Sequence, residues 1–478
     1  MELIRVTGTR TELIDLRDVP GVQVVAASAL DRGDGTWVVS AYAPEGTTAV
    51  VRRRGFTVQP VKSAEQDRTE RARAAGTEYP DSAAIAGRIR ALAGAHPDVC
   101  QLEVLPQRTH EGREVLSVRI NAGVGTGAAV IVIGGVHARE WAQPDALLSL
   151  AEGIVGAYAA GGPFDHPAWV DQTTQPPITY AAWSLPAADV KRLVEGVTLI
   201  LVPLVNPDGR DFSLAGADDL HYMWRKNRRL PSGGTASPWC HGVDLNRNFD
   251  IAWDFDRYYT PAAARAVQSS KKPCDPQVYI GPAAASEPET QNVQGLVIEH
   301  RPAYFMDVHA YARDILYPWG MDDDQGTDPA KNFANPDWDR PGAHGGRDGL
   351  GGVYGEYLPA DVRAQHVAVA ERMRDAMLDQ AGTQSKARRR STYTVKQALG
   401  LYPTTGTTDD YCAGLTMLDR DKPPIHAFCL ECGIDQAADD PTDDEGGFHP
   451  DRNTKYPKIE REVHAAIITL ARAALPAG

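Results

Sequence analysis

The sequence has little of three things that would direct a first interpretation: long apolar runs, net positive charge and cysteine. No apolar run approaches the roughly 18 residues that a membrane-spanning helix needs. The net charge of −14 at pH 7 argues against a general nucleic-acid binder, although a local basic cleft is compatible with it. We therefore expect a soluble globular protein with no membrane partner and no nucleic-acid partner.

The six cysteines exclude some kinds of site and leave others open. None belongs to a pair of CxxC motifs that would form a zinc knuckle, and the lone motif Cys429–Cys432 lies in an apolar strand, where a redox function is not expected. Two interpretations remain: buried free thiols, or one or more disulfides formed in an oxidising compartment. The first residues contain no basic segment followed by a long apolar one, so we expect no secretory signal in this chain.

The length of 478 residues predicts one large domain and a smaller one. Residues 1–61 alternate short β-like runs with turns and short helical segments, which predicts a small ferredoxin-like β-α-β-β-α-β module. Residues 62–78 are highly charged and are interpreted as a connecting helix or linker. The predicted strands of the module are Leu3–Val6, Val22–Ala26, Trp37–Tyr42 and Phe56–Val61, and the predicted helices are Glu12–Leu16 and Thr47–Arg54.

Residues 79–478 show a different pattern, in which apolar strands alternate with helical stripes. This alternation predicts an α/β domain with a largely buried central sheet. The segments Gly161–Ser184 and Met321–Gly355 are predicted to be long loop insertions, which in compact domains usually wall a binding site or are disordered. The basic run Ser385–Arg390 is interpreted as solvated surface.

Two apolar strands of this domain end at potential metal ligands. The run 128–133 breaks at Gly134-Gly135 and is followed by His137 and Glu140. The run 303–308 is followed at once by His309. Ligands of open α/β sheets bind at the carboxyl ends of strands, and two histidines with one glutamate form a known zinc-binding set that leaves a position for water.

Two further charged residues, Glu431 and Arg247, are candidates for functional roles. Glu431 ends another apolar strand, where a glutamate either pairs with an arginine or does acid–base chemistry with a pKa raised by burial. Arg247 lies among turn-prone, hydrogen-bonding residues, and a guanidinium group is a natural partner of a carboxylate or a developing oxyanion.

Taken together, these motifs resemble those of the zinc metallocarboxypeptidases of the carboxypeptidase A and B type. The resemblance covers residues 79–475, and it implies a mixed central β-sheet flanked by helices. The motifs that carry it are His137-Ala138-Arg139-Glu140-Trp141, Asn206-Pro207-Asp208-Gly209, Trp224-Arg225-Lys226-Asn227-Arg228, Asp244-Leu245-Asn246-Arg247-Asn248-Phe249, His309 and Phe428-Cys429-Leu430-Glu431.

The resemblance implies a role for each of these side chains. Glu431 would activate the metal-bound water, and Arg228 would stabilise the oxyanion. The metal, one zinc ion, would be held by His137, Glu140 and His309. Asn246 and Arg247 would grip the free C-terminal carboxylate of a peptide or protein substrate, and Arg225 would line the subsites nearby. We further expect a monomer.

The chain departs from the family pattern in the loop before the catalytic strand. Tyr411 stands where many members have a tryptophan, and Ala413 stands where they have a tyrosine; we expect Tyr411 to reach the substrate. Cys240 and Cys274 bracket the segment of Asn246 and Arg247 as a disulfide pair does in the animal enzymes, which implies a bridge here.

The N-terminal module occupies the place of the family's pro-segments, and Arg71-Ala72-Arg73 in the connector offers a cleavage site. A fixed accessory domain is the alternative. A pro-segment and a disulfide both imply export, which conflicts with the expected absence of a signal sequence.

Two other functions compete with a carboxypeptidase. One is a related zinc amidase or deacylase acting on cell-wall peptides or N-acyl amino acids, against which the Asn246-Arg247 pair argues. The other is a non-catalytic binder of peptide C-termini, against which the presence of three metal ligands and Glu431 argues.

The preference for a terminal side chain depends on the predicted loop Thr404–Pro424. One inward-pointing acid of this loop would favour basic side chains, whereas the segment Thr416–Leu418 would favour apolar ones. The candidate acids are Asp409, Asp410, Asp419 and Asp421.

Overall fold

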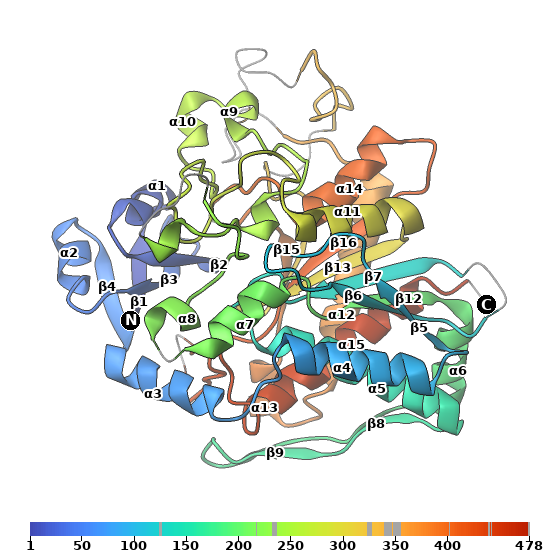
Figure 1. Cartoon of the computed structure of the whole chain (residues 1–478). Coiled ribbons are helices and arrows are strands. Elements are labelled where there is room, and N and C mark those ends of the chain that lie inside the picture. The colour runs from blue at the N-terminus through green and yellow to red at the C-terminus, as the bar shows by residue number, and fades with distance from the viewer. Residues whose placement is uncertain are drawn as a thin grey trace.

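Figure 1 shows a computed structural model of the chain. It describes residues 1–123, 127–216, 218–231, 237–322, 327–338, 347, 355–400, 402–437, 440 and 442–476. Most of the predicted loop insertion Met321–Gly355 therefore lies outside the described residues. A search of the described residues finds no helix with the length and apolar character needed to cross a membrane.

An eight-stranded mixed sheet forms the centre of the large domain, in the order β15-β14-β16-β13-β7-β12-β6-β5. Its middle strands β16, β13, β7 and β12 run parallel to one another, and β6 and β5 continue antiparallel. The strand bounds are β5 Cys100–Val104, β6 Leu116–Ile120, β7 Ala129–Gly134, β12 Thr198–Val202, β13 Tyr304–His309, β14 Asp314–Tyr317, β15 Thr394–Gln397 and β16 His426–Glu431. The predicted mixed sheet flanked by helices is thereby confirmed.

Alternate residues of β7 pack into two different cores. Val130 and Val132 face a core shared with α4, α5, α6 and α15, whereas Ile131 and Ile133 face a core shared with α11 and α14 (Figure 1). A strand covered on both faces is apolar at every position, which explains the unbroken run in the sequence. The helices around the sheet are α4 Ser82–Ala95, α5 Ala142–Ala160, α6 Ala187–Gly196, α11 Pro288–His300, α12 Ala360–Asp379, α14 Thr408–Leu418 and α15 Tyr456–Ala473.

Shorter helices lie in the connections between these elements. They are α7 Pro207–Ala215, α8 Asp219–Tyr222, α9 Phe255–Tyr258, α10 Pro261–Ala264 and α13 Ser385–Arg390.

The N-terminal module has its own four-stranded antiparallel sheet, in the order β2-β3-β1-β4. Its element order is β-α-β-β-α-β, and a separate core that includes Ile4, Val6, Leu13, Val39 and Val51 lies between its sheet and helices. The bounds are β1 Glu2–Gly8, α1 Arg10–Ile14, β2 Gln23–Asp31, β3 Trp37–Ala43, α2 Thr48–Arg53 and β4 Thr57–Lys62.

The charged connector contains the helix α3 Ala64–Ala75, which begins at a capping box formed by Ser63 and Gln66. Arg71 is only 3% exposed, and it forms ion pairs with Asp67 at 2.6 Å and Asp219 at 3.3 Å. The suggested cleavage site therefore lies in a folded helix with its first arginine buried.

Two predictions of irregular structure are wrong: the segment 161–184 forms two antiparallel strand pairs, and the segment 404–424 contains α14. The basic run 385–390 is solvated over most of its residues, as predicted, but Arg390 is buried in ion pairs with Asp171 and Asp443. Strand pairing within the first segment, and packing of α14 in an apolar core, override a local composition that is typical of loops. The paired strands are β8 Phe164–His166, β9 Trp169–Asp171, β10 Ile178–Tyr180 and β11 Trp183–Leu185.

A buried ion cluster joins the module to the large domain. Lys62 is 5% exposed and forms ion pairs with Asp435, with Asp444 at 3.3 Å and with Glu70 at 2.8 Å. Burial alone would lower the pKa of Lys62, but the neighbouring carboxylates outweigh burial and raise the pKa above its ordinary value. Tyr42 adds a hydrogen bond of 2.9 Å to Asp435.

We predict that Lys62→Ala destabilises the folded chain by about 3 kcal/mol, because it leaves buried carboxylates without their cation. The matched control is Lys271→Ala, which removes a 41% exposed lysine paired with Asp254 and Asp256 and should cost less than about 1 kcal/mol. Urea unfolding of both variants measures the difference. Equal effects of the two substitutions would contradict the importance given to the buried cluster.

Candidate functional site

Three neighbouring parallel strands bring the predicted site residues to one edge of the sheet. His309 and Glu431 are the last residues of β13 and β16 and are paired in register, while His137 follows β7 after the turn Gly134-Gly135. Gly135 has a φ of +63°, and a Cβ atom there would lie 2.8 Å from the Leu204 side chain, so glycine is needed for this turn. The carboxyl ends of such strands are where α/β sheets bind ligands.

The side chains of His137, Glu140 and His309 converge. The Nδ1 atom of His137 lies 2.7 Å from Oε1 of Glu140 and 3.0 Å from Nδ1 of His309, which in turn lies 3.1 Å from Oε2 of Glu140. All three residues are buried, and they form a group able to hold a metal ion. Two imidazole nitrogens and one carboxylate fit zinc.

Outer carboxylates orient both histidine rings. Asp244 lies 3.2 Å from Nε2 of His137, and Asp307 lies 2.8 Å from Nε2 of His309. With Nε2 engaged in this way, Nδ1 of each ring is directed toward the metal position. Sequence reasoning missed both acids, although Asp307 lies two residues before His309 and therefore on the same face of β13.

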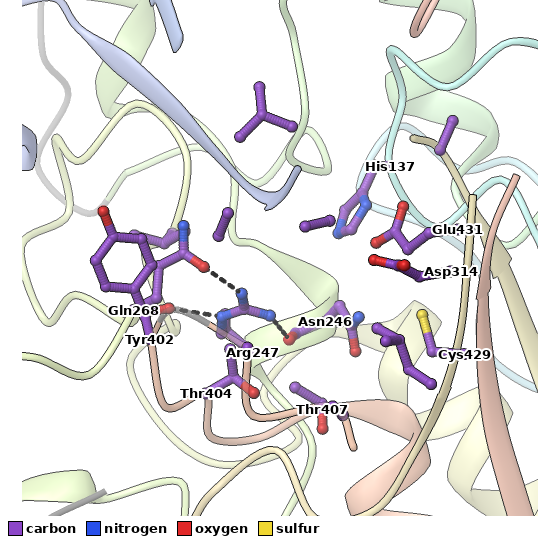
Figure 2. A pocket seen from close by; sticks show the side chains of 18 of the residues that line it. His137, Asn246, Arg247, Gln268, Asp314, Tyr402, Thr404, Thr407, Cys429 and Glu431 are labelled. Carbon is purple, nitrogen blue, oxygen red and sulfur yellow. Dashed lines mark hydrogen bonds between the residues drawn. The ribbon is translucent and has the colours of Figure 1, made fainter. Parts of the chain in front are cut away.

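Glu431 lies beside this group and faces the cavity (Figure 2). Its Oε2 atom has no hydrogen-bond partner within the described part of the chain. Burial raises the pKa of Glu431 to about 7; Glu140 also raises it, while His309 opposes the rise. A carboxylate with this pKa can accept a proton near neutral pH and release it again.

Asn246 and Arg247 form another part of the cavity wall (Figure 2). Nε of Arg247 donates to the Gln268 carbonyl oxygen at 2.7 Å, and NH1 donates to the Asn246 carbonyl oxygen at 2.5 Å. Gly406 has a φ of +65°, and a Cβ atom there would lie 2.4 Å from the Arg247 carbonyl oxygen. The guanidinium group is therefore held in place before any ligand arrives.

Arg225 lines the cavity, whereas the side chain of Arg228 lies against Phe212 and Glu111. Nε of Arg225 donates to Asp244 at 3.0 Å, and its side chain lines the cavity. The guanidinium carbon of Arg228 lies 3.8 Å from the ring centroid of Phe212, and its Nε reaches Glu111 at 3.5 Å. Three residues apart in a segment without helical structure, the two arginines point to different sides.

The tyrosine that lines the cavity is also a different one from the tyrosine that the sequence predicted. Tyr411 lies on α14 and packs against Phe249, with ring centroids 5.7 Å apart, in the apolar core. Tyr402, which sequence reasoning missed, lines the cavity instead (Figure 2), and its hydroxyl donates to the Leu13 carbonyl oxygen of the N-terminal module at 2.8 Å. Its position in the loop after β15 offered no local signal.

Further charged groups complete the cavity. Asp409 lines it and is 4% exposed, and burial raises its pKa. Asp314 and Lys396 form an ion pair of 2.7 Å in the wall, and Figure 2 shows the Asp314 carboxylate close to that of Glu431. Within the described part of the chain, Asp409 is the one acid of the four candidates that lines the cavity.

The cysteine alternatives are resolved by the structure. Cys240 and Cys274 form a disulfide, as the resemblance implied. The other four, Cys100, Cys412, Cys429 and Cys432, are buried free thiols.

Comparison with known proteins identifies the family of this chain and finds a solved structure with the same fold. A model of the zinc carboxypeptidase family matches residues 85–437. A solved structure of carboxypeptidase A from Helicoverpa armigera aligns over 99% of this chain and 97% of that chain, with a TM-score of 0.64 and 20% sequence identity, which shows a shared fold.

Two curated relatives match a smaller part. A carboxypeptidase B of Helicoverpa zea is 30% identical over 234 residues, which is 48% of this chain and 43% of that protein. The inactive metallocarboxypeptidase ecm14 of Talaromyces marneffei is 28% identical over 223 residues, which is 44% of this chain and 30% of that protein. The chain thus spans less than half the length of either relative, and the two relatives differ in activity by name.

Proposed function

Because this chain belongs to the zinc carboxypeptidase family, we propose that it is an exopeptidase that hydrolyses the C-terminal peptide bond of peptides and proteins. One observation carries this proposal: two histidines and a glutamate converge beside Glu431, and Asn246 and Arg247 lie in the same cavity wall. The arrangement joins a hydrolytic centre to a carboxylate-binding group.

Each side chain then has a role in the reaction. His137, Glu140 and His309 would hold one zinc ion, which supplies Lewis-acid chemistry and lowers the pKa of a bound water to about 7. Glu431 takes a proton from the attacking water and passes it to the leaving amine. Its raised pKa serves both transfers.

Arg247 and Asn246 would bind the terminal carboxylate of the substrate. A bidentate guanidinium–carboxylate contact fixes the scissile bond relative to Glu431. An internal peptide bond offers no carboxylate at this position and would leave the buried Arg247 without its anion, which disfavours endopeptidase action.

The oxyanion role, first given to Arg228, is proposed here for Arg225. Arg225 lines the cavity and is held by Asp244, the same acid that orients His137. A guanidinium group tied to the metal-ligand framework is preorganised for the negative charge that develops in the transition state.

The first test is mass spectrometry of a peptide mixture with and without a zinc chelator. We expect single-residue shortening from free C-termini, loss of activity with chelator, and a decrease in kcat of about 10²- to 10⁴-fold in Glu431→Gln because the base is lost. Glu460→Gln, a glutamate of α15 outside the cavity, is the control.

Three results would contradict the proposal. Cleavage of C-terminally blocked substrates alone would favour the amidase or deacylase alternative. Binding without any turnover would favour the non-catalytic alternative. Near-normal turnover in Glu431→Gln would overturn the assignment of the base.

A second test separates the two arginines. Arg225→Gln should lower kcat by about 10²- to 10³-fold with a smaller effect on KM, because an oxyanion donor acts in the transition state. Arg228→Gln should stay close to the wild-type kcat. The reverse order of effects in steady-state kinetics would restore Arg228 to the oxyanion role.

The charge of the cavity supports a preference for basic terminal residues. Asp409 is nearly buried, while Asp410 is engaged by the Gly320 backbone N–H at 2.9 Å and Asp419 pairs with Lys422 at 2.8 Å. Lys396 is already paired with Asp314. A lysine or arginine side chain would therefore find its counter-charge in Asp409.

We expect faster release of C-terminal Arg and Lys than of Leu or Phe. Asp409→Asn should reduce kcat/KM for basic termini by at least about 30-fold, equivalent to roughly 2 kcal/mol, because a buried charge pair is lost. Asp419→Asn is the matched control outside the cavity. A preference for apolar termini in the wild type would contradict this part of the proposal.

We also propose that residues 1–61 act as a pro-segment-like or accessory module, with 62–78 as connector and 79–478 as catalytic domain. Val24–Ala27 of β2 line the cavity, and Gln23 accepts a hydrogen bond of 3.3 Å from Arg139. A module in this position restricts access, so loosening it by Lys62→Ala should raise the turnover of the intact chain. Full activity of the intact wild type on proteins would count against a pro-segment.

The disulfide and the covering module together support export to an oxidising compartment, and we propose that the protein acts there as a monomer.

A further inference from the structure

A second group of potential metal ligands lies apart from the catalytic residues. His110 belongs to the connection between β5 and β6, and Glu287 and Glu289 lie at the start of α11. One ligand atom from each of these three side chains lies within 4.8 Å of the other two. Both glutamates are 0% exposed, while the His110 side chain is 27% exposed.

Both carboxylate oxygens of Glu287 have hydrogen-bond partners, whereas only one oxygen of Glu289 has a partner among the described residues. Oε2 of Glu287 lies 2.8 Å from Nε2 of His110 and 2.8 Å from Nδ2 of Asn227, and its Oε1 lies 3.0 Å from NH1 of Arg229. Oε2 of Glu289 lies 3.1 Å from the same Nδ2 of Asn227. Oε1 of Glu289 has no hydrogen-bond partner among the described residues.

Exchanging the oxygen and nitrogen positions of the Asn227 amide would not give Glu289 a further hydrogen bond. Its Oδ1 accepts from the backbone N–H groups of Val243 at 2.8 Å and Arg229 at 3.3 Å, so Nδ2 must face the two carboxylates. Within the described residues, the cluster thus holds two buried carboxylates against one guanidinium group and the imidazole of His110, with one carboxylate oxygen unpaired. A buried charged atom without a partner costs several kcal/mol, and an ion is one of its standard explanations.

We propose that His110, Glu287 and Glu289 form a second zinc site, structural in role. An ion between Nε2 of His110 and Oε2 of Glu287 would take a carboxylate oxygen of Glu289 as its third ligand, and the partly exposed His110 leaves room for a water as the fourth. An imidazole with two carboxylates suits zinc, whereas calcium and magnesium favour oxygen ligands alone. This proposal does not depend on the catalytic one.

The donor atoms of the cluster lie within 4.8 Å of one another, and the His110–Glu287 pair is closer than two ligands of a bound zinc would be. Ligand atoms around a tetrahedral zinc with bonds of about 2 Å lie roughly 3.3 Å apart. The 2.8 Å between His110 and Glu287 falls within the 2.7–3.1 Å range of the atoms in the catalytic group. Small side-chain shifts would admit an ion at either place.

The position of the cluster indicates what the ion would do. Asn227 is bonded to both carboxylates and lies two residues after Arg225, which lines the cavity. The ion would tie the connection containing His110 and the start of α11 to this segment. It would therefore hold the backbone that carries Arg225.

The test is the zinc content of the full chain after equilibration with free zinc and removal of the excess. It is measured by inductively coupled plasma mass spectrometry. We expect two ions per chain in the wild type and one in His110→Gln and in Glu289→Gln. The double variant His137→Gln/His309→Gln should hold one, and adding His110→Gln to it should remove that ion. His300→Gln, at the other end of α11, is the matched control and should hold two.

Circular dichroism establishes whether each variant is folded. If His110→Gln is not folded, the near-isosteric variant Glu289→Gln takes its place. Zinc should also raise the melting temperature of the His137→Gln/His309→Gln variant, and this rise should vanish with His110→Gln. The same zinc content in the wild type and in folded His110→Gln, or no zinc in the His137→Gln/His309→Gln variant, would overturn the proposal; the cluster would then hold a proton instead.

Discussion

The parallel alignment of β7, β13 and β16 is the constraint on which the rest of the site depends. Because the carboxyl ends of these strands meet at one edge, residues that are far apart in the chain, such as His137, His309 and Glu431, become neighbours. The apolar residues along each strand pack into cores on both faces and hold the edge rigid. The polar ends are therefore placed by the same packing that folds the domain.

Buried charge at this edge is held in a connected network. Asp244 contacts both His137 and Arg225, and Asp307 contacts His309. A buried charge is stable only with partners, and the outer carboxylates of Asp244 and Asp307 supply them for His137, Arg225 and His309. Among the residues that the structure describes, one carboxylate oxygen of Glu431 has no hydrogen-bond partner, which leaves this group free to exchange a proton.

The sequence was most informative where local pattern and tertiary position coincide. His137, Glu140, His309 and Glu431 each follow or end an apolar strand, a position that is visible in the sequence, and the strand order of the structure brings these strand ends together. The choice between Arg225 and Arg228 depends on the course of an irregular segment, which has no periodicity to read.

The helix α14 and Tyr402 were missed, and Tyr411 was expected at the substrate, for a related reason. Acidic and small residues near Asp409 are typical of a loop, yet Tyr411, Cys412 and Ala413 are buried against the sheet and make the segment helical. Tyr402 lines the cavity and packs in the core of the N-terminal module, a long-range contact that leaves no local signal in the sequence.

The contribution of β2 to the cavity wall has a pharmacological consequence. The surface formed by Val24–Ala27 on one side and Arg247 and Tyr402 on the other exists only while the module is in place. If the module is displaced or removed as proposed, a small molecule shaped to touch both sides would recognise the covered form of the protein and ignore the uncovered one. Such a compound could act as a conformational probe, reporting which form predominates in a biological sample.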